Sequence, residues 1–348
     1  MNRLALCLLP LLVSLCAAQA PTTGTANPAF DDLEVEVKAY MRLARCQAAA
    51  VAVSRDGRLL LSRGYGWRDR DKREPTPVDA LFRLGSVTKP ITAAVVKELV
   101  RDGRLRLDSK LLDVLFTGEA RGKLNGRLSR VTIGHLLAHQ GGWDARRSFD
   151  PVFNDLQAQK DLRLGRPATP DDIVRWFLPR PLDFDPGSRT VYSNFGYCLL
   201  GRVVEKVTAR KFEEATTELV LKPWKIEDIR AARTLPRHRH EREVWYPVQD
   251  AMFSLEVMDS CAGLVASAPA MCEFLHRYWL SGDRRETGSK GEFVFVGSLQ
   301  GTTAVVMQRP SGANVVALFN NRRNDDPEGD QKALVKRLGP AVDLAVKD

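Results

Sequence analysis

The chain has 348 residues, of which 44% are hydrophobic and 27% charged, and its formal net charge is +9. This is the composition of a globular protein and argues against a fibrous or disordered chain. Lys and Arg are spread along the sequence, and the densest basic run, at 230–242, contains no Phe, Tyr or Trp. Without a nucleic-acid motif or interleaved aromatic residues, we expect no nucleic-acid partner.

The first 20 residues have the three parts of a secretory signal. Arg3 gives a positive start, residues 4–15 form an apolar run, and Ala-Gln-Ala at 18–20 is a cleavage site. The apolar run is shorter than the roughly 20 residues of a membrane-spanning helix, and no later segment is long and apolar enough. We predict cleavage after Ala20 and a secreted or periplasmic protein without a membrane span. A lipid anchor on Cys16 is the alternative, which the bulky residue before it disfavours.

The predicted elements begin with a helix at 30–43. A β-hairpin follows, with strands at 48–54 and 59–65 around the turn Asp56-Gly57. A second helix runs from Ser86 to Asp102 and stops at Gly103. Helix and loop signals dominate from 105 to 250. The C-terminal part has three strand-like runs and a final helix, at 293–296, 303–308, 314–319 and 330–346.

The second helix carries a serine and a lysine three residues apart, Ser86 and Lys89. This spacing places both side chains on one face of a helix, one turn apart. Pro90 is tolerated only in a first helical turn, so Ser86 lies near the helix N-terminus. The partial positive charge there favours a forming oxyanion. Ser-x-x-Lys alone is a weak signal, because a chain of this length contains about one by chance.

A second group of polar residues, Tyr192-Ser193-Asn194, lies where a Pro-Gly loop meets a new helix. Such a position suits catalytic groups, although an isolated tyrosine is more often a core residue with a bonded hydroxyl. Together with the first pair, four segments resemble, in order, those of the serine β-lactamase and penicillin-binding protein superfamily, in its class C β-lactamase-like branch. They are "LFRLGSVTKPITAAVVKELVRDGRLRLDSKL" (81–111), "VTIGHLLAHQGGW" (131–143), "PGSRTVYSNFGYCLLGRVVEKVTAR" (186–210) and "DSCAGLVASAPAMCEFL" (259–275).

The resemblance implies an α+β fold of the β-lactamase/transpeptidase type. An antiparallel sheet flanked by the terminal helices would carry an inserted all-helical subdomain. Residues 21–348 would form a single domain, with an α/β part at about 28–105 and 255–348 and the helical subdomain at about 106–254. The cleft would lie between the two parts.

The resemblance also implies a site. Ser86 would attack a carbonyl and form an acyl-enzyme, while Lys89 and Tyr192 share the proton transfers. Asn194 would orient Lys89 and the substrate amide, and the backbone N–H groups of Ser86 and Ser298 would form the oxyanion hole. No cofactor and no metal are implied. The substrate would be a small-molecule ester or a cell-wall peptide with a D-amino acid, and the oligomeric state stays open.

The third motif of the superfamily, Lys-Thr-Gly or His-Thr-Gly, is altered. Its first two positions fall on Phe295 and Val296, and only Gly297 is retained. The motif cation is therefore absent, and we interpret Lys290 as a surface residue before the strand. This makes β-lactam hydrolysis less favoured than esterase or carboxypeptidase activity. It also leaves a second hypothesis, a non-catalytic binding or regulatory relative that keeps the fold.

The remaining candidates are histidines and cysteines. His135 and His139 are four apart but lack the glutamate of a His-Glu-x-x-His zinc motif, so we expect structural roles. The mature chain keeps four cysteines, which form either two disulfides or buried thiols. They are Cys46, Cys198, Cys261 and Cys272.

Overall fold

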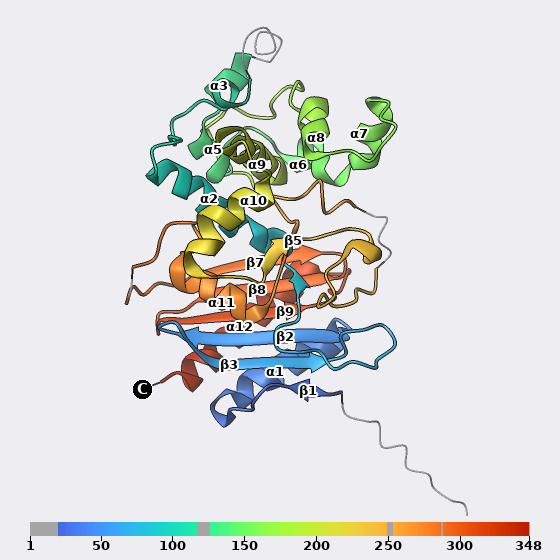
Figure 1. The fold of residues 1–348 in the computed structure, drawn as a ribbon, viewed down its shortest axis with the longest axis vertical. Coiled ribbons are helices and arrows are strands. Elements are labelled where there is room, and N and C mark those ends of the chain that lie inside the picture. Colours follow the sequence, from blue (N-terminus) through green and yellow to red (C-terminus); the bar gives the residue numbers. More distant parts are fainter. Residues whose placement is uncertain (1–19, 117–125, 249–252, 287, 348) are drawn as a thin grey trace, which may run out of the picture.

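The computed structural model describes residues 20–116, 126–248, 253–286 and 288–347, and a six-stranded antiparallel sheet forms its base (Figure 1). The strands lie in the order β1-β3-β2-β9-β8-β7. Their bounds are Thr22–Thr23 (β1), Ala48–Arg55 (β2), Arg58–Gly66 (β3), Phe293–Leu299 (β7), Thr302–Gln308 (β8) and Ala313–Phe319 (β9). The N-terminal hairpin thus pairs with the C-terminal strands through β2 and β9.

The hairpin turn follows directly from its sequence. Asp56 and Gly57 both have positive φ angles, 52° and 76°, as a two-residue turn compatible with strand twist requires. The strands expected around this turn are present, each one residue longer at the turn than predicted. The three C-terminal strands are also where the sequence indicated.

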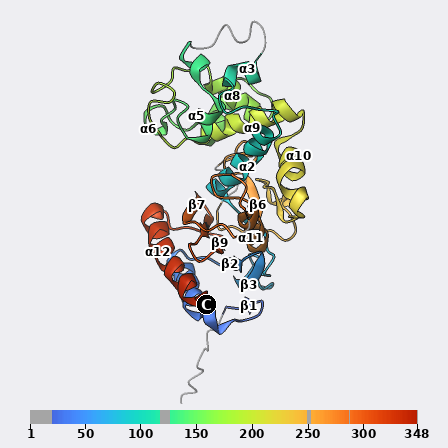
Figure 2. The same cartoon turned by 90° about the vertical axis from the view of Figure 1, so that its left-hand side faces the viewer.

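Strand β2 is apolar along nearly its whole length because it is buried on both faces. Its alternate residues 49, 51 and 53 pack into a core shared with α1 (Asp31–Leu43) and α12 (Pro327–Ala345). Residues 48, 50 and 52 belong to the larger core on the other face, which is covered by α11 (Ala268–Arg277). Figure 2 shows α12 and α11 on opposite sides of the sheet. The expected sheet flanked by terminal helices is confirmed.

The middle of the chain forms a helical region at the upper end of the molecule in Figure 1. Its longest helix, α9 (Asn194–Thr208), is buried from Phe195 to Val204. The α-helices around it are α3 (Leu111–Leu115), α5 (Ile133–Leu137), α6 (Ala145–Ser148), α7 (Asp155–Asp161), α8 (Pro170–Phe177) and α10 (Phe212–Thr216). Helix α2 (Thr88–Arg101) contacts α9 and lies between this region and the sheet.

Short 3₁₀ and π turns complete the helical elements. They are η1 (Pro28–Phe30), η2 (Gly85–Val87), η3 (Gly126–Arg130), η4 (Pro151–Phe153), the π turn η5 (Thr217–Leu221), η6 (Lys222–Trp224) and η7 (Pro236–His238). The expected helix from Ser86 therefore begins as the 3₁₀ turn η2 and becomes α-helical only at Thr88. Pro90 is then the third residue of α2, within its first turn, where its missing N–H costs nothing.

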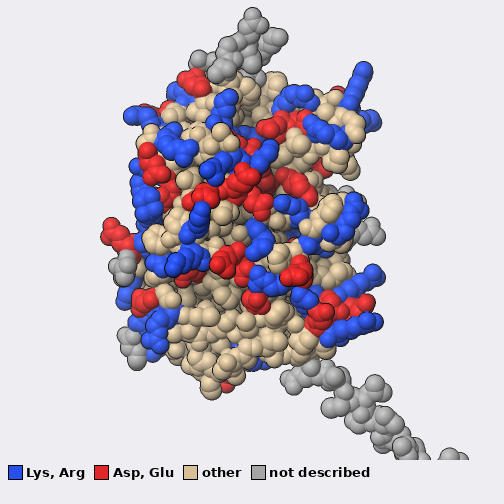
Figure 3. Space-filling view, viewed as in Figure 1, with Lys and Arg blue, Asp and Glu red and all other residues tan. Residues whose placement is uncertain are grey.

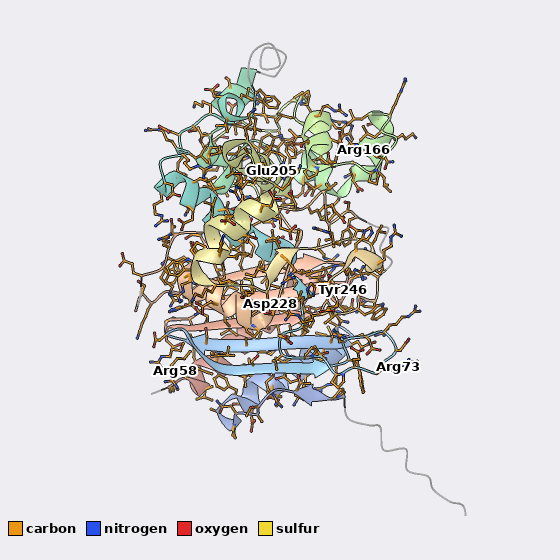
Figure 4. All side chains as sticks on the ribbon, in the orientation of Figure 1. Arg58, Arg73, Arg166, Glu205, Asp228 and Tyr246 are labelled. Atoms are coloured by element: carbon orange, nitrogen blue, oxygen red, sulfur yellow. The ribbon has the colours of Figure 1, made fainter. Side chains whose placement is uncertain are left out.

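A small sheet that the sequence did not reveal holds the start of this helix. It has the order β4-β6-β5, with bounds Phe82–Arg83 (β4), Leu264–Ala266 (β6) and Ile229–Ala231 (β5). Strands of two or three residues are too short to show an alternating pattern. The N–H of Arg83 donates to the hydroxyl of Tyr246 at 2.8 Å, and Figure 4 labels this tyrosine beside the strands. Strand β4 leads directly into the turn of Ser86.

Several expectations concern the surface and the termini. The predicted signal segment lies outside the described residues except for Ala20. None of the helices in the described ranges combines the length and hydropathy needed to cross a bilayer. Basic and acidic side chains are interspersed over the face seen in Figure 3. All four cysteines of the described chain are free thiols, so the disulfide alternative is wrong.

Candidate active site

Ser86 is the least buried residue of an otherwise buried turn. Leu84, Gly85 and Val87 are buried, while Ser86 is half-buried. Gly85 has a φ of 52°, a conformation that favours glycine and turns the chain sharply from β4 into η2. The Leu84 N–H donates to the Leu264 carbonyl at 2.9 Å. The local backbone thus presents one hydroxyl from a fixed turn.

Lys89 lies fully buried behind that hydroxyl, with an exposed fraction of 0%. Its Nζ donates to Ser86 Oγ at 3.2 Å, to Asn194 Oδ1 at 2.6 Å and to the Cys261 carbonyl at 2.8 Å. An ammonium has three donors, so these three acceptors satisfy it. A buried charge is tolerated only when its hydrogen bonds are complete. The expected pairing of Ser86 with Lys89 is present in the fold.

Tyr192 contacts the same hydroxyl. Its Oη lies 2.6 Å from Ser86 Oγ in a hydrogen bond. Lys89 Nζ lies 4.7 Å from the centre of the Tyr192 ring, a cation–π distance. The tyrosine is 47% exposed, so it is not the core residue that an isolated tyrosine would suggest. The hydroxyl of Ser86 therefore stands between a phenol and an ammonium.

His139 supports the loop of Tyr192. Its Nδ1 accepts the backbone N–H of Ser193 at 3.2 Å, and its ring lies 4.7 Å from the Tyr192 ring between centres. Burial, and then the nearby Lys89 charge, lower the pKa of His139 to about 4. The imidazole is therefore neutral at pH 7, which leaves Nδ1 free to accept. Ser193 itself caps α9 by accepting the Gly196 N–H at 3.1 Å.

Asn194 links Lys89 to a carboxyl group that sequence reasoning did not identify. While Asn194 Oδ1 accepts from Lys89, its Nδ2 donates to Asp150 Oδ2 at 2.7 Å. Asp150 also caps η4, accepting the Val152 N–H at 3.3 Å. Burial raises the pKa of Asp150. The Asp-Pro pair at 150–151 signals a turn, but nothing local in the sequence indicates that it contacts Asn194.

Strand β7 passes close to the serine turn. A Cβ added at Gly297 would lie 1.9 Å from the Leu84 carbonyl oxygen and 3.2 Å from the Ser86 nitrogen, so only glycine fits. A Cβ added at Gly85 would lie 3.1 Å from the Ser298 nitrogen. The backbone nitrogens of Ser86 and Ser298 are thus on adjoining segments, as a two-donor oxyanion hole requires.

The altered motif positions on β7 bring no cation. Phe295 packs against the larger core and Val296 against the core on the α1 and α12 side. Lys290 lies in the loop before the strand. A different cation is present: Arg322, three residues beyond β9, donates from Nη1 to Ser298 Oγ at 2.8 Å. Sequence reasoning missed this residue because it belongs to no motif.

The structure therefore brings Ser86, Lys89, Tyr192 and Asn194 into one hydrogen-bonded cluster, with Ser298 beside it. The other candidate pair does not form a site. His135 accepts the Thr132 N–H at 3.4 Å as part of a helix cap. Within the described ranges, no three His, Cys, Asp or Glu side chains gather in a way that could hold a metal ion.

Comparisons with known proteins agree with this architecture. Two curated relatives are the "Probable fimbrial assembly protein FimD, serogroup H1" of Dichelobacter nodosus and the esterase EstB of Burkholderia gladioli. They are 34% identical over 154 residues and 36% identical over 192 residues, which are 44% and 54% of this chain. The matches cover 36% and 48% of the relatives, so the chain spans less than half the length of either.

The solved structure of the D-amino acid amidase from Ochrobactrum anthropi SV3, complexed with L-phenylalanine amide, superimposes with a TM-score of 0.70. It covers 91% of this chain and 98% of the amidase at 17% sequence identity. A likeness at this identity establishes the fold, and the expected β-lactamase/transpeptidase type is confirmed. The family model described as "Beta-lactamase" matches residues 34–339. The chain therefore belongs to the Beta-lactamase family.

Proposed function

We propose that this protein is a serine hydrolase that forms an acyl-enzyme at Ser86 and acts on esters or on amides of D-amino acids. The observation that supports it most is the position of Ser86 Oγ, 2.6 Å from Tyr192 Oη and 3.2 Å from Lys89 Nζ. A nucleophile within hydrogen-bond reach of groups that can take its proton is the arrangement of covalent catalysis. The relatives named as an esterase and a D-amino acid amidase support the substrate class.

In acylation, Ser86 Oγ attacks the substrate carbonyl carbon while its proton passes to the phenolate form of Tyr192, and the ammonium of Lys89 stabilises that phenolate. A phenol is a useful base at neutral pH only if a cation stabilises its anion, and the ammonium of Lys89 lies over the tyrosine ring. The carbonyl oxygen becomes an oxyanion, which the N–H groups of Ser86 and Ser298 stabilise. The carbon–oxygen or carbon–nitrogen bond then breaks, and the leaving alcohol or amine takes the proton.

In deacylation, water attacks the carbonyl carbon of the ester on Ser86. Tyr192, with Lys89 beside it, takes a proton from this water and returns a proton to Ser86 Oγ. Asn194 holds Lys89 in place through Oδ1, and Asp150 fixes that amide through Nδ2. The acid is released and the Ser86 hydroxyl is restored. β-Lactam hydrolysis is the less favoured reaction, because Phe295 and Val296 occupy the positions of the motif cation.

Covalent labelling tests the proposal. The protein is incubated with a fluorescent fluorophosphonate and, separately, with a fluorescent penicillin, and adducts are read by intact mass. Ser86→Ala should abolish labelling, whereas Ser188→Ala, which changes an exposed loop serine bonded only to the Asp185 carbonyl, should label like the wild type.

Turnover then separates the substrate classes. We expect the wild type to hydrolyse p-nitrophenyl butyrate or D-alanine p-nitroanilide, and Ser86→Ala to hydrolyse neither. The ratio of the two rates gives the preference for esters over D-amino acid amides. A folded wild-type protein that forms no adduct with either reagent and hydrolyses neither substrate would establish the non-catalytic alternative.

A further inference from the structure

A cavity that shares no residue with the candidate active site opens where β3 ends. Its volume is about 620 Å³, which is in the range of small-molecule sites. Its walls come from the C-terminal part of α1 with the chain that follows, and from the end of β3 with the loop after it. The cations and aromatic residues of the lining are Lys38, Arg42, Arg45, Tyr65, Trp67 and Lys72. The label of Arg73 in Figure 4 marks this end of the sheet.

Three of the four cations have no counter-ion in the part of the chain that the structure describes. The side chains of Arg42, Arg45 and Lys72 make no ion pair there, whereas Lys38 pairs with Glu34 at 3.1 Å. None of the described residues that line the cavity is acidic. The negative end of a helix attracts cations, which accounts for Arg42 in the last turn of α1 but not for Lys72 from a separate loop. Because like charges around one cavity repel each other, a bound anion would stabilise them.

Hydrogen bonds fix the loop that carries Lys72. The carboxylate of Asp69 accepts the backbone N–H groups of Arg73 and Glu74 at 2.9 and 2.8 Å. The side-chain amide of Gln47 donates to the Asp69 carbonyl and so joins the loop to the residue before β2. The nearest acidic group of known geometry in this loop is therefore bound to the backbone, and the ammonium of Lys72 stays available.

The number of unpaired cations suits a phosphate better than a carboxylate. A phosphate monoester carries up to two negative charges on three acceptor oxygens, and a guanidinium matches this geometry with paired donors. The lining also contains a half-buried indole, Trp67, and a buried phenol ring, Tyr65. A flat aromatic surface binds a ring by stacking. The cavity thus combines a place for a phosphate with a place for a ring.

We propose that this cavity binds an organic phosphate, with its phosphate group held by Arg42, Arg45 and Lys72 and its ring placed against Trp67. Nucleoside monophosphates and sugar phosphates share this chemistry, and the experiment distinguishes the two. The site is separate from Ser86, so it does not depend on the proposed hydrolase function.

Calorimetric titration of the wild type with AMP and with glucose 6-phosphate tests the site, with adenosine and glucose as the unphosphorylated partners. At least one of the phosphates should bind once per chain with a Kd of about 1 mM or lower, and the tighter of the two identifies the ring. Its unphosphorylated partner should bind at least about tenfold more weakly. Binding should weaken as the NaCl concentration rises, because salt screens exposed charges.

The variants Arg42→Ser and Lys72→Ser locate the binding. Each should raise the Kd about tenfold or more, the loss expected for a charged hydrogen bond, and both side chains are exposed, so folding should not suffer. Arg73→Ser in the same loop and Arg58→Ser at the opposite end of β3 are matched controls, since neither residue lines the cavity. Both controls should bind as the wild type does, and Arg42→Ser should keep the wild-type rate of ester hydrolysis.

Four results would overturn phosphate binding in this cavity. The first is no heat and no rise in melting temperature with either phosphate at about 10 mM, well above the expected Kd. The second is equal binding of the phosphates and their unphosphorylated partners. The third is an equal loss of binding in the controls and in Arg42→Ser. The fourth is binding to phosphatidylglycerol vesicles without binding of either soluble phosphate, which would assign the cations to a lipid surface.

Discussion

The neutral imidazole of His139 makes a specific prediction about acid stability. Its Nδ1 accepts the Ser193 N–H at 3.2 Å next to the loop of Tyr192. Protonation would turn this acceptor into a donor facing another donor, and would place a positive ring near Lys89. Burial and that neighbouring charge are the reasons that the pKa of His139 falls from 6.5 to about 4 in the folded protein.

The size of the effect follows from linkage between protonation and folding. Below pH 6.5 the unfolded chain binds this proton more readily than the folded one, so stability falls as the pH drops from 6.5 toward 4. Each pKa unit corresponds to about 1.4 kcal/mol, so the total contribution of His139 to the free energy of unfolding is about 3 kcal/mol. About 2 kcal/mol of this is lost between pH 7 and pH 5.

The substitution His139→Asn isolates this contribution. Asparagine does not titrate, places an amide oxygen near the position of Nδ1, and tolerates the left-handed backbone at this site, where φ is 56°. Urea unfolding of the wild type and the variant is measured at pH 7 and at pH 5. The wild type should lose about 2 kcal/mol more than the variant over that interval. His238→Asn changes an exposed histidine and should behave as the wild type.

A wild type and a His139→Asn variant with the same pH dependence would refute the reasoning. That result would mean either that His139 is protonated in the folded protein at pH 5 without penalty, or that the Ser193 contact does not depend on its neutral form. Comparing two proteins over one pH interval cancels the other titrating groups, which act in both.

Three further predictions concern the site itself. Gly297→Ala should lower kcat/KM at least about 100-fold, because the new Cβ would lie 1.9 Å from the carbonyl oxygen of Leu84, next to the turn of Ser86. The control Gly165→Ala adds a Cβ in open space and should not change the rate of ester hydrolysis. Tyr192→Phe should reduce kcat by about 10² to 10⁴, measured with p-nitrophenyl butyrate. It should leave the melting temperature within about 2 °C, because phenylalanine keeps the ring and its contacts with Lys89 and His139. An unchanged kcat would exclude the phenol from proton transfer. Asp150→Ala should reduce kcat at least about tenfold, because it removes the oxygen that accepts from Asn194 and so releases the amide that holds the buried ammonium. A folded variant with intact activity would contradict the positioning role.

The elements that the sequence predicted well are those whose signals are local. The Asp56-Gly57 turn needs only two residues with positive φ, and the apolar runs of the C-terminal strands are long enough to read. The Ser86–Lys89 contact also follows from helical spacing. What the sequence could not show is pairing between distant short segments, such as the small sheet of β4, β5 and β6, whose strands have two or three residues each.

The supporting residues of the site were missed for the same reason. Asp150 contacts Asn194 from 44 positions away, and Lys89 bonds to the backbone carbonyl of Cys261 from 172 positions away. Because every residue type has a backbone carbonyl, the sequence gives no sign of which carbonyl accepts the hydrogen bond from Lys89. His139 was assigned a structural role, and the structure shows that its contact is with the loop of Tyr192 itself.

The altered third motif shows how position in a sequence and position in space can differ. A motif ties a cation to one strand, so its replacement by Phe295 and Val296 suggests a site without positive charge. A sheet brings neighbouring strand ends together, however, and Arg322 beyond β9 reaches Ser298 on β7 although β8 lies between those strands. Electrostatic attraction depends on distance and burial and not on chain order. The loss of the motif cation therefore argues against anion binding by a motif side chain on β7. It does not argue against anion binding at this site by a cation from another segment.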